Sequence, residues 1–152
     1  MRVLSLCLLL AACRSPDIPL ASLAVSNGVL PSGETSSPDR EAIRATIEAF
    51  YIGDHTGSVE HKRASMHPQG AYRYVDDEGT YRESRFRLEE SRGDTSYQEE
   101  LLSIEIYEAV ALARLRLESQ RREEAEYKLM TLHKTTDGWL ITGISWGWGV
   151  TH

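Results

Sequence analysis

The amino-acid sequence predicts an α+β domain built on a strongly curved sheet. Helical periodicity and capping signals fill the first half of the folded region, and long strand-like segments joined by polar or Gly-containing turns fill the second half. Helices followed by such strands are typical of an α+β domain with an antiparallel sheet, not of a parallel α/β sheet. Several segments are longer than a small flat sheet accommodates, which indicates that the sheet is strongly curved or partly closed.

The first helix is predicted to begin at Pro38. Ser37 is a suitable N-cap, and proline is favoured at the first helical position. Apolar residues then recur at the spacing of one helix face, and these are Ile43, Ile47, Phe50 and Tyr51. Gly53 follows this stripe and is expected to end the helix.

Two shorter helices are predicted to follow. Gly57-Ser58 opens the second, which runs over residues 59–66 and is closed by Pro68. A third is predicted over residues 84–91, with Ser84 as its cap and Phe86 facing inward.

Six strand segments complete the predicted domain. The first two form a hairpin around a turn at residues 76–79, and they cover residues 71–75 and 80–82. The other four cover residues 101–107, 109–118, 125–134 and 139–148. Asp137-Gly138, between the last two, is a strong hairpin signal, and we expect a loop longer than two residues there.

This order of elements resembles the nuclear transport factor 2-like superfamily, from Pro38 to about Trp148. Within it, the chain is similar to the lumazine-binding subfamily in three motifs: Phe50-Tyr51-Ile52-Gly53, the helix ending in His67-Pro68, and Leu129-Met130-Thr131-Leu132 followed by Asp137-Gly138-Trp139-Leu140-Ile141. Gly57-Ser58 and Gln69-Gly70 depart from the subfamily pattern. The resemblance implies a cone-shaped half-barrel, in which a strongly curved antiparallel or mixed sheet wraps about three N-terminal helices.

The resemblance also implies a range of functions. Superfamily members bind small, mostly apolar ligands between the helices and the sheet, and some, such as the ketosteroid isomerases and polyketide cyclases, transfer protons there without a cofactor. That chemistry needs a desolvated carboxylate or histidine as base and a hydrogen-bond donor for the developing oxyanion. The candidate bases are Asp54, His55, His67 and His133. The candidate donors are Tyr51, Tyr72, Tyr74, Tyr127, Trp139, Trp146 and Trp148.

Two classes of function therefore stay open. The first is a module that binds a small apolar or aromatic ligand, or a protein, with the pocket candidates Tyr51, His67, Tyr72, Tyr74, Tyr127 and Trp139. The alternative is a cofactor-independent isomerase, lyase or cyclase, with the catalytic candidates Asp54, His55 and His133. No carboxylate falls clearly within an apolar face, which favours binding over catalysis. A homodimer through the sheet is expected from the resemblance.

Composition argues against several other classes. The formal net charge of -6 at pH 7 disfavours a nucleic-acid partner, which requires a basic surface. Both cysteines, Cys7 and Cys13, lie in the first thirteen residues, so the domain has no thiol for a metal site or a nucleophile. The spacing of His55, His61 and His67 does not place them on one helix face. We therefore expect neither a metal nor a cofactor.

The first thirteen residues, MRVLSLCLLLAAC, resemble a bacterial lipoprotein signal. The positive Arg2 precedes an apolar run that ends in Leu10-Ala11-Ala12-Cys13, which is similar to a lipobox, so Cys13 would be the lipidated residue. The run spans only about half of a bilayer's hydrocarbon core, which disfavours a transmembrane anchor. An ordinary secretory signal and a misassigned start codon stay open as alternatives.

The chain is thus predicted to have three parts. Residues 1–12 are the signal peptide, residues 13–36 a lipidated flexible tether that contains Pro16, Pro19 and Pro31, and residues 37–152 the domain. A lipid anchor on Cys13 would attach the domain to a membrane of the bacterial cell envelope. Without that lipid the protein would be secreted or periplasmic.

Overall fold

The computed structural model describes residues 37–76, 78–119 and 125–148. The chain divides into two units, Met1–Glu34 and Thr35–His152, and the second unit contains every described residue. The predicted signal peptide and tether, Cys13 included, lie outside the described residues.

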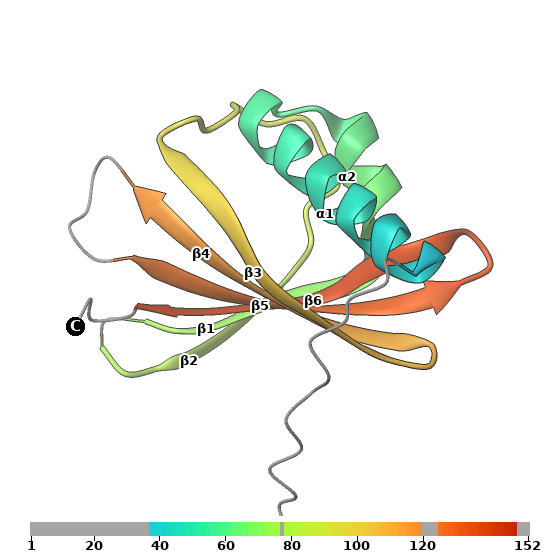
Figure 1. Cartoon of the computed structure of the whole chain (residues 1–152). Helices are drawn as coiled ribbons and strands as arrows, with labels where there is room; N and C mark the ends of the chain where they lie inside the picture. The colour runs from blue at the N-terminus through green and yellow to red at the C-terminus, as the bar shows by residue number, and fades with distance from the viewer. Residues whose placement is uncertain (1–36, 77, 120–124, 149–152) are drawn as a thin grey trace, which may run out of the picture. The chain divides into compact units, whose positions relative to one another are not determined.

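The described unit has an α+β fold, as the sequence predicts (Figure 1). Its elements are α1 (Pro38–Thr56), α2 (Val59–Ser65), β1 (Met66–Val75), β2 (Tyr81–Arg85), β3 (Tyr97–Tyr107), β4 (Val110–Ser119), β5 (Glu126–Thr135) and β6 (Gly138–Trp148). Neither described helix combines the length and the apolar character needed to cross a bilayer.

The strands form one mixed, curved sheet, and both helices pack against one face of it (Figure 1). The strand order is β2-β1-β6-β5-β4-β3, and every neighbouring pair is antiparallel except β1 and β6. The register shifts within the β1–β6, β3–β4 and β5–β6 pairs. Such irregularities increase local twist and bend a sheet, which is how long strands close around two helices.

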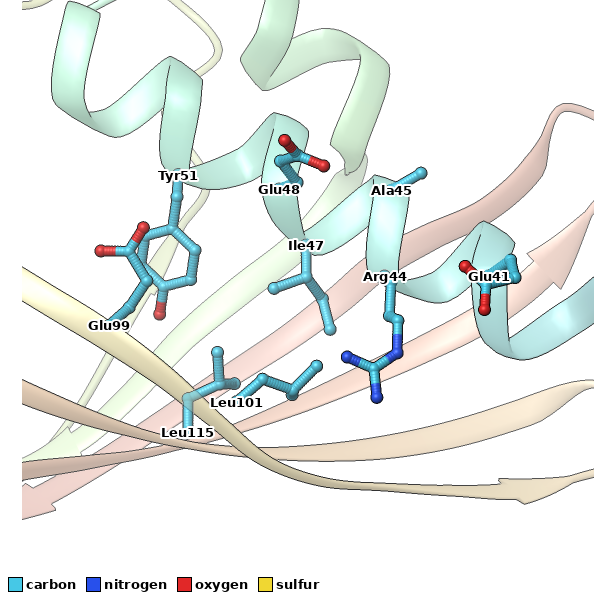
Figure 2. A pocket seen from close by; sticks show the side chains of 9 residues that line it. All are labelled: Glu41, Arg44, Ala45, Ile47, Glu48, Tyr51, Glu99, Leu101 and Leu115. Carbon is cyan, nitrogen blue, oxygen red and sulfur yellow. The ribbon is translucent and has the colours of Figure 1, made fainter. Parts of the chain in front are cut away.

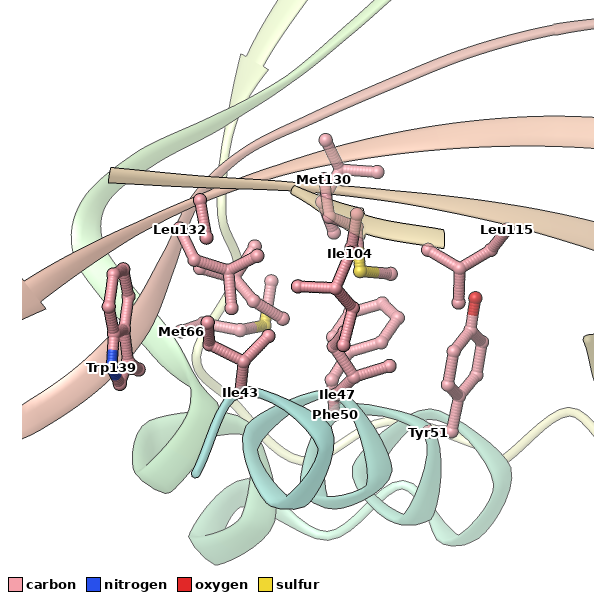
Figure 3. Close-up of a cluster of buried hydrophobic side chains, with 14 of the residues drawn as sticks. Ile43, Ile47, Phe50, Tyr51, Met66, Ile104, Leu115, Met130, Leu132 and Trp139 are labelled. Carbon is pink, nitrogen blue, oxygen red and sulfur yellow. The ribbon is translucent and has the colours of Figure 1, made fainter. Parts of the chain in front are cut away.

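The core lies between α1 and the inner face of the sheet (Figure 3). The predicted stripe of α1 is buried, and it meets Met130 and Leu132 of β5. In β4 alternate residues are buried, namely Ala111, Ala113, Leu115 and Leu117, as expected for a strand with one covered face. Burial of a large aliphatic side chain contributes about 1.5–3 kcal/mol, so this contact fixes α1 on the sheet.

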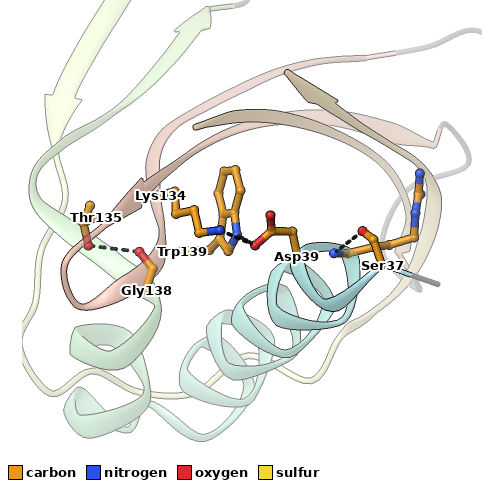
Figure 4. Close-up of polar contacts among 7 residues, drawn as sticks. Ser37, Asp39, Lys134, Thr135, Gly138 and Trp139 are labelled. Atoms are coloured by element: carbon orange, nitrogen blue, oxygen red, sulfur yellow. Dashed lines mark hydrogen bonds and ion pairs between the residues drawn. The ribbon is translucent and has the colours of Figure 1, made fainter. Parts of the chain in front are cut away.

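The N-terminus of α1 is held at both its backbone and its side chains (Figure 4). The Ser37 hydroxyl accepts a hydrogen bond from the Arg40 amide, which confirms the predicted cap. One Asp39 carboxylate oxygen accepts hydrogen bonds from Lys134 Nζ at 2.7 Å and from Trp139 Nε1 at 3.0 Å. The start of α1 is therefore tied to the β5–β6 hairpin.

The predicted end of α1 is wrong. The helix continues past Gly53 to Thr56, and Gly57 is its C-cap, with φ at 78°. Gly53 is buried inside the helix because α2 crosses there: a Cβ at Gly53 would lie 3.0 Å from the Lys62 backbone nitrogen. Gly53 therefore allows a close helix contact, and Gly57 supplies the left-handed residue that ends the helix.

The predicted third helix does not form, so the sheet wraps two helices instead of about three. Residues 84–85 belong to β2, and no helix is present between β2 and β3. The backbone there bonds to distant segments instead: the Ser91 amide donates to the Gly57 carbonyl and the Asp94 amide to that of Asp54. Phe86 is nevertheless buried, as predicted.

The β5–β6 hairpin is tighter than predicted. β5 ends at Thr135 and β6 begins at Gly138, which leaves a two-residue loop. Gly138 adopts a φ of 106°, and the Thr135 hydroxyl donates to its carbonyl (Figure 4). The expectation of a longer loop was wrong because the glycine takes up the backbone conformation that the tight turn requires.

Candidate functional site

A cavity of about 460 Å³ lies between α1 and strands β3 and β4 (Figure 2). It is lined by Glu41, Arg44, Ala45, Ile47, Glu48, Tyr51, Glu99, Leu101 and Leu115. Ile47, Leu101 and Leu115 supply its apolar part, and the charged side chains come from the exposed side of α1 and from β3. Four of the nine lining residues are charged, so the cavity combines an apolar base with charged groups around it.

Tyr51 supplies an unpaired polar group to this cavity. It continues the apolar stripe of α1, and only 3% of its surface is exposed. Its hydroxyl is buried and has no hydrogen-bond partner within the described part of the chain. Burial raises the pKa of Tyr51 well above its usual value of 10, and the Glu99 carboxylate adds to the effect. The hydroxyl therefore stays protonated and can both donate and accept.

A polar cluster adjoins Tyr51 at the C-terminal end of α1. α1 provides Asp54 and His55, and β3 provides Tyr97 and Glu99, which share a face because they are two residues apart. The Tyr97 hydroxyl donates to the Asp54 carboxylate. His55 Nε2 lies 3.4 Å from Glu99 Oε2, and the His55 ring packs against the edge of Tyr97 at 4.9 Å between ring centroids.

The cluster has two chemical consequences. Asp54, a predicted base, is engaged by a phenol and does not line the cavity. Burial and the hydrogen bond to Asp54 together raise the pKa of Tyr97. Glu99 belongs both to the cavity lining and to the polar cluster, because its side chain lines the cavity and contacts His55. The arrangement can therefore bind a polar group at Glu99 and Tyr51.

The sequence did not single out Tyr97, Glu99, Leu101 or Leu115. Tyr97 and Glu99 lie in a polar stretch just before the predicted strand over residues 101–107, so no pattern in the sequence indicated that they belong to it. The available signal was the alternation of Tyr97, Glu99 and Leu101, which places all three on the inner face of β3. Leu115 appeared only as part of a strand, because sequence alone does not show which buried residues border a space.

The predicted donors on β1 and β6 form an aromatic group. Tyr74 stacks on Trp146 at 4.4 Å between centroids, and Tyr72 meets Trp146 and Phe86 edge-on at 5.7 and 4.7 Å. Burial raises the pKa of Tyr72 to about 12, with a further contribution from Asp54. These rings do not line the cavity that α1 and β3 enclose.

The other predicted residues lie elsewhere. Tyr127 and His133 are exposed on β5, where they alternate with the buried Met130 and Leu132, so they lie on the sheet face opposite the helices. His133 Nδ1 is hydrogen-bonded to the Thr142 hydroxyl at 2.7 Å. His67 Nδ1 accepts from the Gln69 amide at the start of β1. The indole N–H of Trp139 donates a hydrogen bond to the Asp39 carboxylate.

The described residues offer no candidate metal site. Within residues 37–76, 78–119 and 125–148, no group of three or more His, Cys, Asp or Glu side chains is placed to hold a metal ion. The side chain of Trp148 and the residues after it lie outside the part that the structure describes.

The fold is shared with several solved structures. The chain is similar to a nuclear transport factor 2-like (NTF2-like) protein of unknown function from Shewanella baltica, with a TM-score of 0.64 and 13% identity over 78% of this chain and 100% of that one. It is also similar to an NTF2-like protein of unknown function from Methylobacillus flagellatus, with a TM-score of 0.62 and 16% identity over 77% and 97%. A third, from Silicibacter pomeroyi, gives 0.59 and 9% over 72% and 94%.

These similarities show that the domain has the NTF2-like α+β fold. No family model matches the sequence. No curated protein matches it. The assignment to the lumazine-binding subfamily stays a prediction.

Proposed function

We propose that the domain binds a small organic ligand in the cavity between α1 and strands β3 and β4. The observation that carries the proposal is the Tyr51 hydroxyl, which is buried, unpaired within the described residues, and part of the cavity wall. A buried donor without a partner costs about 1–3 kcal/mol, so a ligand group that pairs with it gains binding free energy. We further propose that the protein is a lipoprotein of the bacterial envelope, anchored through Cys13.

The rest of the cavity supports this proposal. Its volume of about 460 Å³ lies within the range of small-molecule sites. Ile47, Leu101 and Leu115 offer apolar surface to a ring or chain, and each square ångström removed from water contributes about 25 cal/mol. The ligand that fits is therefore largely apolar, with a hydrogen-bonding group directed at Tyr51.

Two adjacent leucines of β3 provide a matched test. Leu101 lines the cavity, whereas Leu102 is 41% exposed and does not. We expect Leu101→Trp to fill the cavity and Leu102→Trp to leave it open. Native mass spectrometry of the purified full-length protein would detect co-purified small molecules, which the first variant should lose and the second retain. A ligand retained by both folded variants would place binding elsewhere.

A second candidate is cofactor-free proton transfer, because Glu99 and Tyr51 line the same cavity and Glu99 contacts His55. Glu99 is only partly shielded, with 28% of its side chain exposed, whereas the bases in such reactions are desolvated. This difference favours binding. Incubation of the captured ligand with the protein in D₂O separates the two: an enzyme would introduce deuterium and lose this activity in Glu99→Gln, and a binding module would not.

A further inference from the structure

We infer that the cavity selects ligands carrying a protonated amine, which binds between Glu99 and the Tyr51 hydroxyl. The inference rests on the proposed function and names the chemistry of its ligand. Two independent observations carry it: the charge of the cavity lining, and the unpaired hydroxyl that lies beside that charge.

The lining is acidic, with three carboxylates, those of Glu41, Glu48 and Glu99, against the single guanidinium of Arg44. Glu48 has no hydrogen bond or ion pair in the described part of the chain. The ion-pair partner of Glu99 is His55, which is charged only when protonated. Lys128 is a permanent cation close to the polar cluster, with its Nζ 5.4 Å from the centre of the Tyr97 ring. Its ion-pair partner, however, is Glu126 at 3.5 Å, and it does not line the cavity. Among the residues that line the cavity, no permanent cation pairs with the Glu99 carboxylate.

Arg44 does not neutralise this end of the cavity. It precedes Tyr51 by seven residues on α1, which corresponds to roughly 10 Å along the helix axis. Figure 2 shows the Glu99 carboxylate beside the Tyr51 ring and the Arg44 guanidinium at the other end of the cavity. The two ends of the cavity therefore differ: Glu99 lies at the Tyr51 end, whereas Arg44 and Glu41 lie together at the other end.

The Tyr51 hydroxyl is the hydrogen-bonding group at the Glu99 end of the cavity. Only 3% of Tyr51 is exposed, and its oxygen is buried with lone pairs that no described group uses, so an ammonium N–H reaches it only when the side chains that cover it move apart. Burial is the main cause of the raised pKa of Tyr51, and the charges of Glu99, Asp54 and Glu126 add to it, which indicates a negative potential at that oxygen. The same potential stabilises a positive charge placed there, and the protein as a whole carries -6.

Three probes that share a phenyl ring test the inference: 2-phenylethylamine as the cation, 2-phenylethanol as the neutral compound and phenylacetate as the anion. Each is titrated into the full-length protein at pH 7, and the backbone amides of Tyr51, Leu101 and Leu115 are followed by NMR. We expect the amine to bind about tenfold more tightly than the alcohol, and phenylacetate to bind weakest. Added salt should weaken binding of the amine only.

Variants identify the groups responsible. Glu99→Gln should weaken the amine several-fold without affecting the alcohol, Arg44→Gln should tighten the amine, and Tyr51→Phe should weaken both. Equal or tighter binding of the alcohol or of phenylacetate would overturn the charge selectivity while leaving the cavity as a ligand site. If none of the probes shifts the three amides and no ligand co-purifies, the proposed function fails and the inference with it.

Discussion

At the scale of single residues, two buried tyrosines differ in whether their hydroxyls are paired. The Tyr51 hydroxyl has no partner within the described structure, whereas the Tyr97 hydroxyl donates to Asp54. A buried group that is unpaired opposes folding, and a paired one supports it. The unpaired hydroxyl of Tyr51 is therefore consistent with the proposed role, in which a ligand supplies the missing partner.

This contrast predicts opposite effects of the same substitution. Tyr51→Phe removes an unpaired hydroxyl and should raise the free energy of unfolding of the ligand-free protein by about 1 kcal/mol. Tyr97→Phe leaves the Asp54 carboxylate without its phenol and should lower the free energy of unfolding by about 1–2 kcal/mol. Urea denaturation followed by circular dichroism measures both. A loss of stability in Tyr51→Phe would show that its hydroxyl has a partner in solution.

Sequence reasoning succeeded for residues whose role is set by near neighbours. The Ser37 cap and the buried stripe of α1 depend on residues three or four positions away, which periodicity reads directly. The same periodicity placed Tyr51 on the buried stripe of α1, whereas its role as a pocket residue came from the family resemblance and stays a prediction. Glu99 was missed because its role depends on α1, about fifty residues earlier in the chain, and no local pattern encodes that contact.

At the scale of elements, the end of α1 and the segment between β2 and β3 form one packed unit. Lys62 Nζ donates to the Ser91 hydroxyl at 2.6 Å and to the Glu89 carbonyl at 3.3 Å, while backbone bonds join this segment to Gly57 and Asp54. These partners are distant in sequence. They explain why the third helix, predicted from local signals at Ser84, did not form.

Gly57 should be the least replaceable residue of this unit. It has a φ of 78°, and a Cβ there would lie 1.9 Å from the Ser91 carbonyl oxygen. Gly79 has nearly the same φ, 77°, with nothing within 4 Å of its Cβ position. Left-handed backbone costs alanine about 1–2 kcal/mol, which is all that Gly79→Ala should lose.

Gly57→Ala should lose clearly more, about 3–5 kcal/mol, because overpacking against backbone adds to the left-handed strain. Thermal unfolding of the two variants side by side isolates the contact from the strain. Equal losses of stability in both variants would mean that the segment between β2 and β3 moves away from the new methyl group at no cost in free energy. That segment would then not hold the end of α1.

The other end of α1 makes stability depend on pH. Hydrogen bonds from Lys134 and then Trp139 lower the pKa of Asp39 below its usual 3.8. The contribution of this carboxylate is therefore complete above the unfolded-state pKa and is lost as the pH falls through the lower folded-state pKa. We expect the stability difference between the wild type and Asp39→Asn to shrink in this acid range. Denaturation midpoints measured across it check this, and a difference independent of pH would contradict it.

At the scale of the whole molecule, the order of elements was enough to predict the fold. Four long strand segments and the glycine turn at Gly138 were placed from sequence, and the solved structures with the same fold confirm the architecture. The parallel pairing of β1 with β6 was left open in the prediction of an antiparallel or mixed sheet. This pairing joins the first strand to the last. It depends on the topology of the whole sheet, which local sequence patterns do not determine.

A homodimer through the sheet is a further proposal at this scale, and it rests on the family resemblance. Tyr127 and Leu129 are 41% and 44% exposed on the sheet face opposite the helices, where a second copy would cover them. Leu129→Arg should then give monomers in light scattering coupled to size exclusion. Ala64→Arg, which adds the same charge on α2, should leave the dimer intact. A monomeric wild type would end the proposal.

The proposed lipid anchor would decide where the cavity operates. Each acyl methylene buried in a bilayer contributes about 0.8 kcal/mol, so the two or three chains of a lipoprotein hold a domain at the membrane stably. Cys13→Ser should abolish labelling by a fatty-acid analogue and release the protein from membranes. Cys7→Ser is the matched control, because it removes the other cysteine of the proposed signal and should preserve both. Membrane retention and labelling unchanged in Cys13→Ser would mean that the apolar run, and not a lipid, holds the protein, and that the ligand is met in another compartment.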